Sequence, residues 1–128
     1  MSPKLYRVIY PVPDIETAVA FFRLVLRLTG ERVSPGRHYF DLGGTILAVY
    51  DPAADGDEVA EWKHHPNQYI YIAVRDLEAA LARAREAGAV VLGPGIEEMP
   101  WGERLVYARD PLGGPFCLVD DATLFTGN

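Results

Sequence analysis

Hydrophobic positions along the chain follow a strand period and then a helix period, and this succession occurs twice. Residues 5–10 and 69–74 are short runs rich in β-branched and aromatic side chains, which predicts strands. Each run is followed by apolar residues at helical spacing, which predicts a helix with one sheet-covering stripe. The stripes consist of Ile15, Ala18, Val19, Phe22, Val25 and Leu26 in the first helix and of Leu77, Ala80, Leu81 and Ala84 in the second.

The ends of both helices carry matching signals. Asp14 and Asp76 stand where an N-cap is expected, each with a Glu two residues later that favours the positive end of the helix dipole. Gly30 and Gly88 stand where a left-handed residue would end the helix. The two helices are therefore predicted to begin and end in the same way.

The similarity of the two halves amounts to an internal repeat. Residues 12–23 and 74–85 are identical at six of twelve positions at one fixed offset. Each helix is followed by three short apolar segments separated by Gly and Pro, which predicts three strands. We place these strands at 31–34, 38–42 and 45–50, and at 89–92, 103–109 and 115–119. The prediction is an α+β fold in which residues 1–128 form one domain of two βαβββ modules, 4–50 and 67–119, joined by an acidic linker, 51–66.

Composition narrows the classes of partner. The net charge of −6 and the pI near 4.9 argue against nucleic acid or an anionic membrane as a partner. Cys117 is the only cysteine, so no intrachain disulfide is possible. No stretch has the length and apolarity of a signal peptide or a membrane span. We therefore expect a soluble cytoplasmic protein.

The repeat and its motifs resemble a known superfamily. The doubled βαβββ layout, the Val-x-Asp openings at Val12 and Val74, and Asp110-Pro-Leu-Gly113 before the last strand are similar to the vicinal-oxygen-chelate superfamily. That superfamily includes glyoxalase, fosfomycin-resistance enzymes, extradiol dioxygenases and bleomycin-resistance proteins. The resemblance covers residues 4–119. It implies that the modules form a curved, half-open mixed β-barrel with the helices on the convex face and a ligand cavity on the concave face.

The resemblance also implies four metal-ligand positions, which can be checked here. The two first-strand positions fall on Arg7 and Tyr69, and the two final-strand positions fall on Ala48 and Cys117. A guanidinium, a phenol, a methyl group and one thiol do not supply the His and carboxylate ligands of a catalytic metal. We therefore predict no metal and no cofactor, and a closer similarity to the bleomycin-resistance branch, whose members bind a small molecule without chemistry.

Strand alternation indicates which strand residues face the expected cavity, and Trp62 and Trp101 lie in Pro- and Gly-containing segments where an aromatic lid could stack on a ligand or bury against a second subunit. The predicted ligand-binding side chains combine aromatic rings with arginines. They suit an aromatic or apolar ligand with a polar group held by Arg7 or Arg104, and the charge of that group stays open. Cys117 is expected to be a small buried hydrophobe and not a nucleophile. The predicted ligand-binding residues are Arg7, Ile9, Ala48, Tyr50, Trp62, Tyr69, Tyr71, Trp101, Arg104 and Cys117.

The preferred hypothesis is a protein that sequesters a small molecule, and the resemblance implies that it is a homodimer. Two alternatives to this hypothesis stay open. The first is a lyase or dioxygenase whose metal site uses His64, His65 and Glu61, or a metal-free isomerase or lyase that uses Tyr69 or Arg7. Adjacent histidines usually point apart, and we expect both to be solvated loop residues. The second alternative is an interaction module whose cavity is filled by its own side chains. No catalytic residue is assigned.

Overall fold

The computed structural model describes residues 2–58 and 63–127 and divides them between two similar halves. The first half contains β1 (Arg7–Pro11), α1 (Ile15–Leu26), β2 (Glu31–Ser34), β3 (Arg37–Leu42) and β4 (Thr45–Tyr50). The second half contains β5 (Ile70–Val74), α2 (Leu77–Glu86), β6 (Val90–Val91), β7 (Glu97–Glu98), β8 (Arg104–Arg109), β9 (Pro115–Asp120) and a short 3-10 helix, Asp121–Thr123.

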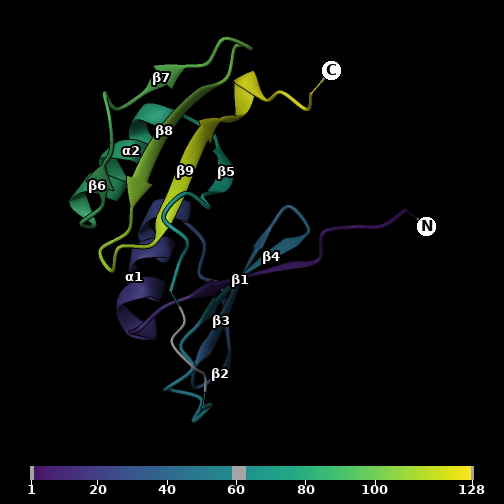
Figure 1. Ribbon diagram of the computed structural model, residues 1–128, viewed down its shortest axis with the longest axis vertical. Helices are drawn as coiled ribbons and strands as arrows, with labels where there is room; N and C mark the ends of the chain where they lie inside the picture. The colour runs from purple at the N-terminus through teal and green to yellow at the C-terminus, as the bar shows by residue number, and fades with distance from the viewer. Residues whose placement is uncertain (1, 59–62, 128) are drawn as a thin grey trace.

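Each half forms its own mixed sheet. The first sheet has the order β1-β4-β3-β2, with β1 parallel to β4, and the second has the order β5-β9-β8-β6, with β5 parallel to β9. The predicted α+β fold with a βαβββ repeat is confirmed. In the described part of the chain the two sheets do not close into a barrel (Figure 1).

One predicted strand of the second half is shorter than expected. The segment 89–92 is reduced to β6, and β7 follows it, so that β6 and β7 pair with opposite ends of β8. Gly93, Pro94 and Gly95 separate the two strands. Pro94 has no N–H for a strand ladder, and both glycines have positive φ, so a continuous strand cannot form there.

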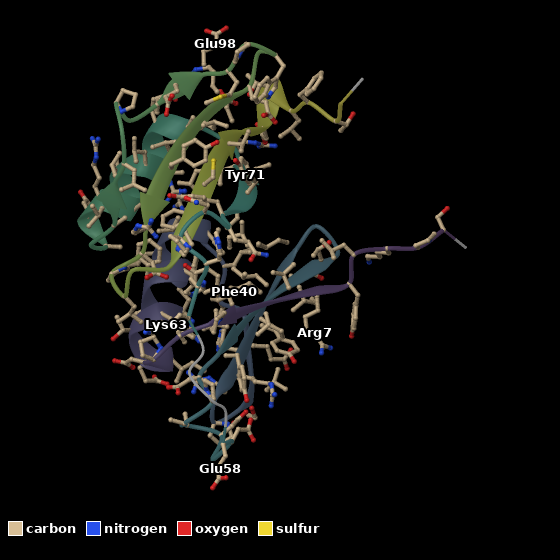
Figure 2. All side chains as sticks on the ribbon, viewed as in Figure 1. Arg7, Phe40, Glu58, Lys63, Tyr71 and Glu98 are labelled. Atoms are coloured by element: carbon tan, nitrogen blue, oxygen red, sulfur yellow. The ribbon has the colours of Figure 1, made fainter. Side chains whose placement is uncertain are left out.

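Aromatic rings on α1 join the two sheets into one core. The ring centroid of Phe22 lies 5.3 Å from that of Tyr10 in β1 and 6.3 Å from that of Phe40 in β3. Phe21 and Phe22 also contact Phe116 of β9, at 5.6 and 6.3 Å. Figure 2 places Phe40 near the middle of the molecule. The helix-covered sides of both sheets therefore share a single hydrophobic core.

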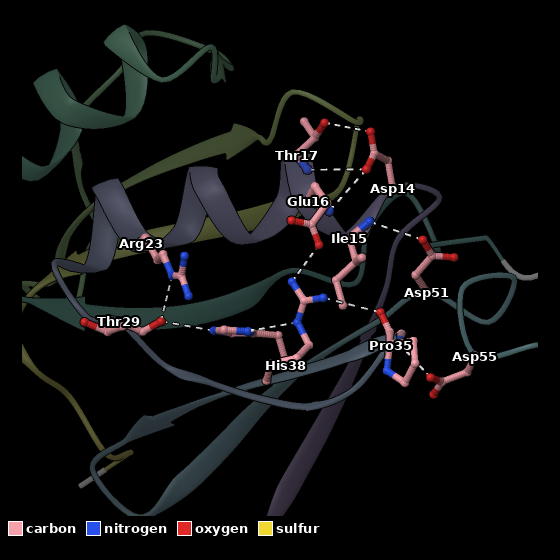
Figure 3. Close-up of polar contacts among 12 residues, drawn as sticks. Asp14, Ile15, Glu16, Thr17, Arg23, Thr29, Pro35, His38, Asp51 and Asp55 are labelled. Carbon is pink, nitrogen blue, oxygen red and sulfur yellow. Dashed lines mark hydrogen bonds and ion pairs between the residues drawn. The ribbon is translucent and has the colours of Figure 1, made fainter.

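The predicted helix ends are confirmed at three of the four positions. Asp14 and Asp76 are the N-caps, and their carboxylates accept hydrogen bonds from backbone N–H groups of the first turn (Figure 3 shows Asp14). Gly88, with φ +100°, follows the end of α2. Gly30 was wrong as a cap: α1 ends at Leu26, and Arg27 takes the left-handed conformation.

Gly30 is needed for a different reason, which is the buried imidazole of His38. A Cβ at Gly30 would lie 2.6 Å from Nε2 of His38. The ring of His38 is 1% exposed; its Nε2 lies 3.0 Å from the carbonyl oxygen of Thr29, and its Nδ1 accepts a hydrogen bond from Nε of Arg32 (Figure 3). These partners fix a neutral tautomer, with the proton on Nε2. Burial lowers the pKa of His38, and the nearby guanidinium groups of Arg23 and Arg32 lower it further.

A buried hydrogen bond links the two halves directly. The hydroxyl of Tyr10 donates to Oδ2 of Asp110 at 2.6 Å, and the two residues are 2% exposed each. Oδ1 of Asp110 accepts from the N–H groups of Leu112 and Gly114, which closes the turn between β8 and β9. Burial and the adjacent carboxylate raise the pKa of Tyr10, so its proton stays on the phenol.

Neither helix of the described residues is long and apolar enough to cross a membrane.

Removal of the Tyr10 hydroxyl should weaken the whole fold. Tyr10→Phe leaves the buried carboxylate of Asp110 one donor short, and we expect the free energy of unfolding to fall by about 1–3 kcal/mol. Urea unfolding followed by circular dichroism measures this. Tyr39→Phe is the control, because the Tyr39 hydroxyl makes no hydrogen bond within the described residues. Equal losses in the two variants would contradict a special role for the Tyr10 contact.

His38 should make the protein sensitive to mild acid. Its pKa in the folded state lies below that in the unfolded state, so stability is complete above about pH 6.5 and is lost as the pH falls below it, by at most about 1.4 kcal/mol per pH unit. Thermal unfolding between pH 5 and 8 should show a shallower loss for His38→Gln, which can keep both hydrogen bonds without taking up a proton. His65→Gln, at an exposed histidine, should behave as wild type.

Candidate functional site

The open face of the second sheet carries a cluster of tyrosines. Strand pairing places Tyr71 of β5, Cys117 of β9 and Tyr107 of β8 in one row. The hydroxyl oxygens of Tyr71 and Tyr107 are 2.8 Å apart. The ring of Tyr107 meets those of Tyr69 and Tyr71 edge to face, at centroid distances of 5.0 and 5.9 Å. We call Tyr69, Tyr71 and Tyr107 the tyrosine cluster.

The hydroxyl pair of the tyrosine cluster leaves one hydrogen for a ligand. Only one of the two phenols can donate within the pair, so the other can donate outward. The hydrogen bond with Tyr71 raises the pKa of Tyr107, and partial burial adds to the effect. Tyr71 is 55% exposed, so its ring and hydroxyl are accessible. The cluster therefore offers an aromatic surface with a neutral donor.

Cys117 forms the floor of this face. Its side chain is 0% exposed and belongs to a small apolar group with Leu105 and Val119. Burial raises the pKa of the thiol to about 12. The thiol is therefore almost fully protonated at neutral pH, and the thiolate is the form that reacts and binds metals. The prediction of a small buried hydrophobe is confirmed.

The open face of the first sheet carries Arg7, Ile9 and Ala48. Ile9 is 38% exposed and Ala48 is fully buried beside it. The guanidinium of Arg7 lies 4.8 Å from the ring centroid of Tyr6 and 5.0 Å from that of Tyr39. Its hydrogen bond within the described residues goes to the Tyr6 hydroxyl and not to a carboxylate. Arg7 is therefore a cation oriented by aromatic rings.

Tyr50, predicted on the same face, is covered by the segment that follows it. Its ring is 6% exposed and lies 4.4 Å from the guanidinium of Arg37. Its hydroxyl donates to Asp57, and this bond raises its pKa. Asp55 accepts hydrogen bonds from Ser34, Gly36 and Arg37, which holds the start of the acidic segment against the first sheet.

The other predicted residues occupy separate places. Arg104 donates to Asp120 at 2.8 Å and pairs with Glu78 of α2, so it lies on the helix-covered side of its sheet. Trp101 is 51% exposed in the loop between β7 and β8, and its indole donates to Glu103 at 2.6 Å. Trp62 and Glu61 lie outside the described residues.

The predicted residues therefore fall on two sheets. Tyr69, Tyr71 and Cys117 share the second, whereas Arg7, Ile9, Ala48 and Tyr50 belong to the first. Figure 2 shows Tyr71 and Arg7 on the two halves of the molecule. The sequence analysis missed Tyr39 and Tyr107, which pair with Ala48 and Cys117 at equivalent places in the repeat. Aligning the third strands of both modules would have found them.

The four positions at which the resemblance implies metal ligands do not fit a metal. They carry the guanidinium of Arg7, the methyl group of Ala48, the phenol of Tyr69 and the buried thiol of Cys117. The described residues contain no group of three or more His, Cys, Asp or Glu side chains that could hold an ion.

One of the two linker histidines, His64, was predicted to be solvated and is only partly exposed. Nε2 of His64 lies 2.6 Å from the carbonyl oxygen of Pro11, and its ring centroid lies 4.5 Å from that of Tyr10. His65 is exposed, as predicted, and its Nδ1 accepts from the N–H of Asn67. The contact with β1 explains the difference, because it shields the imidazole of His64 from water.

Comparison with known proteins agrees with this geometry. The family model described as the Glyoxalase/Bleomycin resistance protein/Dioxygenase superfamily matches residues 4–118. None of the curated proteins compared with this chain matches it.

Solved structures with the same fold include three bacterial examples. A glyoxalase/bleomycin resistance protein from Albidiferax ferrireducens T118 is 20% identical to this chain, with a TM-score of 0.74. The match covers 90% of this chain and 97% of the other chain. A glyoxalase-related enzyme from Fulvimarina pelagi is 17% identical with a TM-score of 0.75, covering 98% and 94%. A superfamily member from Sphaerobacter thermophilus DSM 20745 is 25% identical with a TM-score of 0.64, covering 93% and 98%.

Proposed function

Because the chain belongs to the Glyoxalase/Bleomycin resistance protein/Dioxygenase superfamily, we propose that it binds a small molecule and sequesters it without metal or cofactor. The ligand is aromatic or apolar and carries a polar handle. The observation that carries the proposal is the tyrosine cluster, in which two hydroxyls meet at 2.8 Å beside exposed ring surface. Stacking and edge contacts with such rings contribute about 0.5–1.5 kcal/mol each beyond the area they bury.

The reactive groups near the cluster favour binding over chemistry. The Cys117 thiol, with a pKa near 12, is a poor nucleophile at neutral pH. The pKa of Tyr107 is raised, so its phenol stays protonated at neutral pH and is not available to accept a proton. Neutral donors and rings of this kind hold a ligand in place, and they leave its bonds intact.

The polar handle has a candidate anchor at the edge of the cluster. The guanidinium of Arg109 lies 5.9 Å from the ring centroid of Tyr69, and within the described residues it donates only to the carbonyls of Pro66 and Gly113. Arg104, by contrast, is already held by two carboxylates. Arg109 therefore has more capacity to bind an acceptor group of the ligand.

We also propose that the functional unit is a homodimer. Ile9 exposes 38% of its surface on the open face of the first sheet, and Leu5 and Tyr6 expose 69% and 62% in the arm before β1. Apolar side chains gathered on a face are typical of surfaces that pack against another chain. A second copy of the chain could cover them.

Equilibrium dialysis against a panel of aromatic carboxylates and aromatic amines tests ligand binding. We expect saturable binding of at least one compound. Tyr71→Ala should weaken it about tenfold or more, because an exposed anchor ring is lost. Tyr107→Phe should weaken it about three- to tenfold, because the hydroxyl pair is lost. Phe125→Ala, at an exposed ring in the C-terminal tail, should bind as wild type.

Three results would count against sequestration. The first is the absence of saturable binding across the panel, and the second is equal binding by the Tyr71→Ala variant. The third is one equivalent of a transition metal per chain that disappears in a His64→Ala/His65→Ala variant, which would favour the lyase or dioxygenase alternative.

Light scattering after size-exclusion chromatography tests the dimer. The mass should be about twice the chain mass of 14.2 kDa. Ile9→Asp should shift it toward the monomer, because a carboxylate would be buried in the interface. Val90→Asp is the control, since Val90 is 59% exposed on β6. A monomeric wild type, or the same shift in both variants, would refute this assembly.

A further inference from the structure

A large cleft lies between the two sheets, and Tyr71 of the tyrosine cluster is one of the residues at its border. Its volume is about 1020 Å³, which is within the range of small-molecule sites. The edge strand β1 and its neighbour β4 border it on one side, and the edge strand β5 and α2 border it on the other. Its apolar wall includes Val8, Val25, Ile46, Ile70 and Val74.

Three of the chain's ten arginines line this cleft, although the protein is acidic overall. Arg27 follows α1 and Arg75 precedes α2; the side chain of neither makes a hydrogen bond or ion pair within residues 2–58 and 63–127. The cleft's two carboxylates are used locally: Asp41 accepts from the N–H of Gly44, and Asp76 caps α2. Both carboxylates keep their charge, and the three guanidinium groups outnumber them in the lining of the cleft.

Arg83, the third arginine, has a donor without a partner. Its Nη2 donates to the carbonyl oxygen of Val25 at 3.0 Å, which helps to cap the end of α1. Its Nε is buried and has no hydrogen-bond partner among the described residues. A buried unsatisfied donor on a charged group costs about 1–3 kcal/mol or more. Capping explains one donor of Arg83, and the buried Nε leaves this cleft-lining guanidinium incompletely hydrogen-bonded among the described residues.

We propose that this cleft binds an amphipathic organic anion, with an alkyl chain against the apolar wall and a carboxylate beside Arg83, Arg27 and Arg75. The charges favour this occupant over an amine, and the apolar wall favours it over a small inorganic anion. The cleft shares Tyr71 with the tyrosine cluster, but its arginines and its apolar wall lie outside that cluster, and the inference does not rest on the function proposed above. A second copy covering the cleft is the competing occupant, and the experiment distinguishes the two.

Isothermal titration calorimetry with dodecanoate, below its micelle concentration, tests the site on the whole protein. We expect saturable binding of one dodecanoate per chain. Dodecyltrimethylammonium has the same chain with the opposite charge and should bind at least about tenfold more weakly, because it meets three guanidinium groups. Hexanoate should also bind more weakly, because it buries fewer methylene groups.

Paired variants on and beside α2 locate the site. Arg83→Met and Arg75→Met should each weaken dodecanoate binding about tenfold, whereas Arg85→Met, at an exposed arginine two residues beyond Arg83, should not. Ala79 lines the cleft and Ala82 is exposed on the same helix, so Ala79→Phe should block binding and Ala82→Phe should not. Circular dichroism shows whether each variant is folded. If Arg83→Met unfolds because it loses the hydrogen bond to the Val25 carbonyl, Arg75→Met still tests the site, because it keeps that hydrogen bond.

The following outcomes overturn the proposal. One is the absence of dodecanoate binding, and another is equal affinity for the ammonium compound. A third is binding that Ala79→Phe and Arg75→Met leave unchanged. If Arg75→Met or Ala79→Phe instead alters the oligomeric mass while wild type binds no dodecanoate, a second copy occupies the cleft.

Discussion

The arrangement of the two halves depends on the hydrogen bond between Tyr10 and Asp110. It joins β1 to the turn before β9 across 100 positions of sequence, and both side chains are buried. The same carboxylate orders that turn through the N–H groups of Leu112 and Gly114. Gly114 is required there because a Cβ would lie 2.1 Å from the Tyr10 hydroxyl. One carboxylate therefore fixes a local turn and the relative position of the two sheets.

The linkage between the two halves determines which surfaces of the protein can bind ligands. Because the helix-covered sides of both sheets share one core, their open faces remain available for other contacts. The tyrosine cluster belongs to one sheet and Arg7 to the other, so each face presents its own chemistry. The cleft between β1 and β5 is a third surface, formed because neither edge strand pairs with the other.

Local patterns predicted most of the fold, and contacts over long sequence distances account for what they missed. The repeat, the helical stripes and the Asp14 and Asp76 caps depend on neighbours within a few residues, and all are confirmed. Gly30 was misassigned because its neighbour His38 is brought to it by β3. The contact of His64 with β1 was missed for the same reason. Tyr69, directly before β5, and Tyr71 in β5 were found by alternation, whereas Tyr107 was missed because the third strands of the two modules were not aligned with each other.

An acidic protein can still hold an anion where its arginines are left unpaired. Arg32, Arg37 and Arg104 are neutralised by carboxylates at close range, and they contribute little to attraction. Within the part of the chain that the structure describes, Arg27 and Arg75 of the cleft have no carboxylate partner. At physiological salt the field of exposed surface charges decays within about 8 Å, so the net charge of −6 acts mainly on the approach of a ligand. Inside the cleft the three guanidinium groups lie nearer to a ligand than the rest of the protein's charges and outnumber the carboxylates of Asp41 and Asp76, which favours an anion.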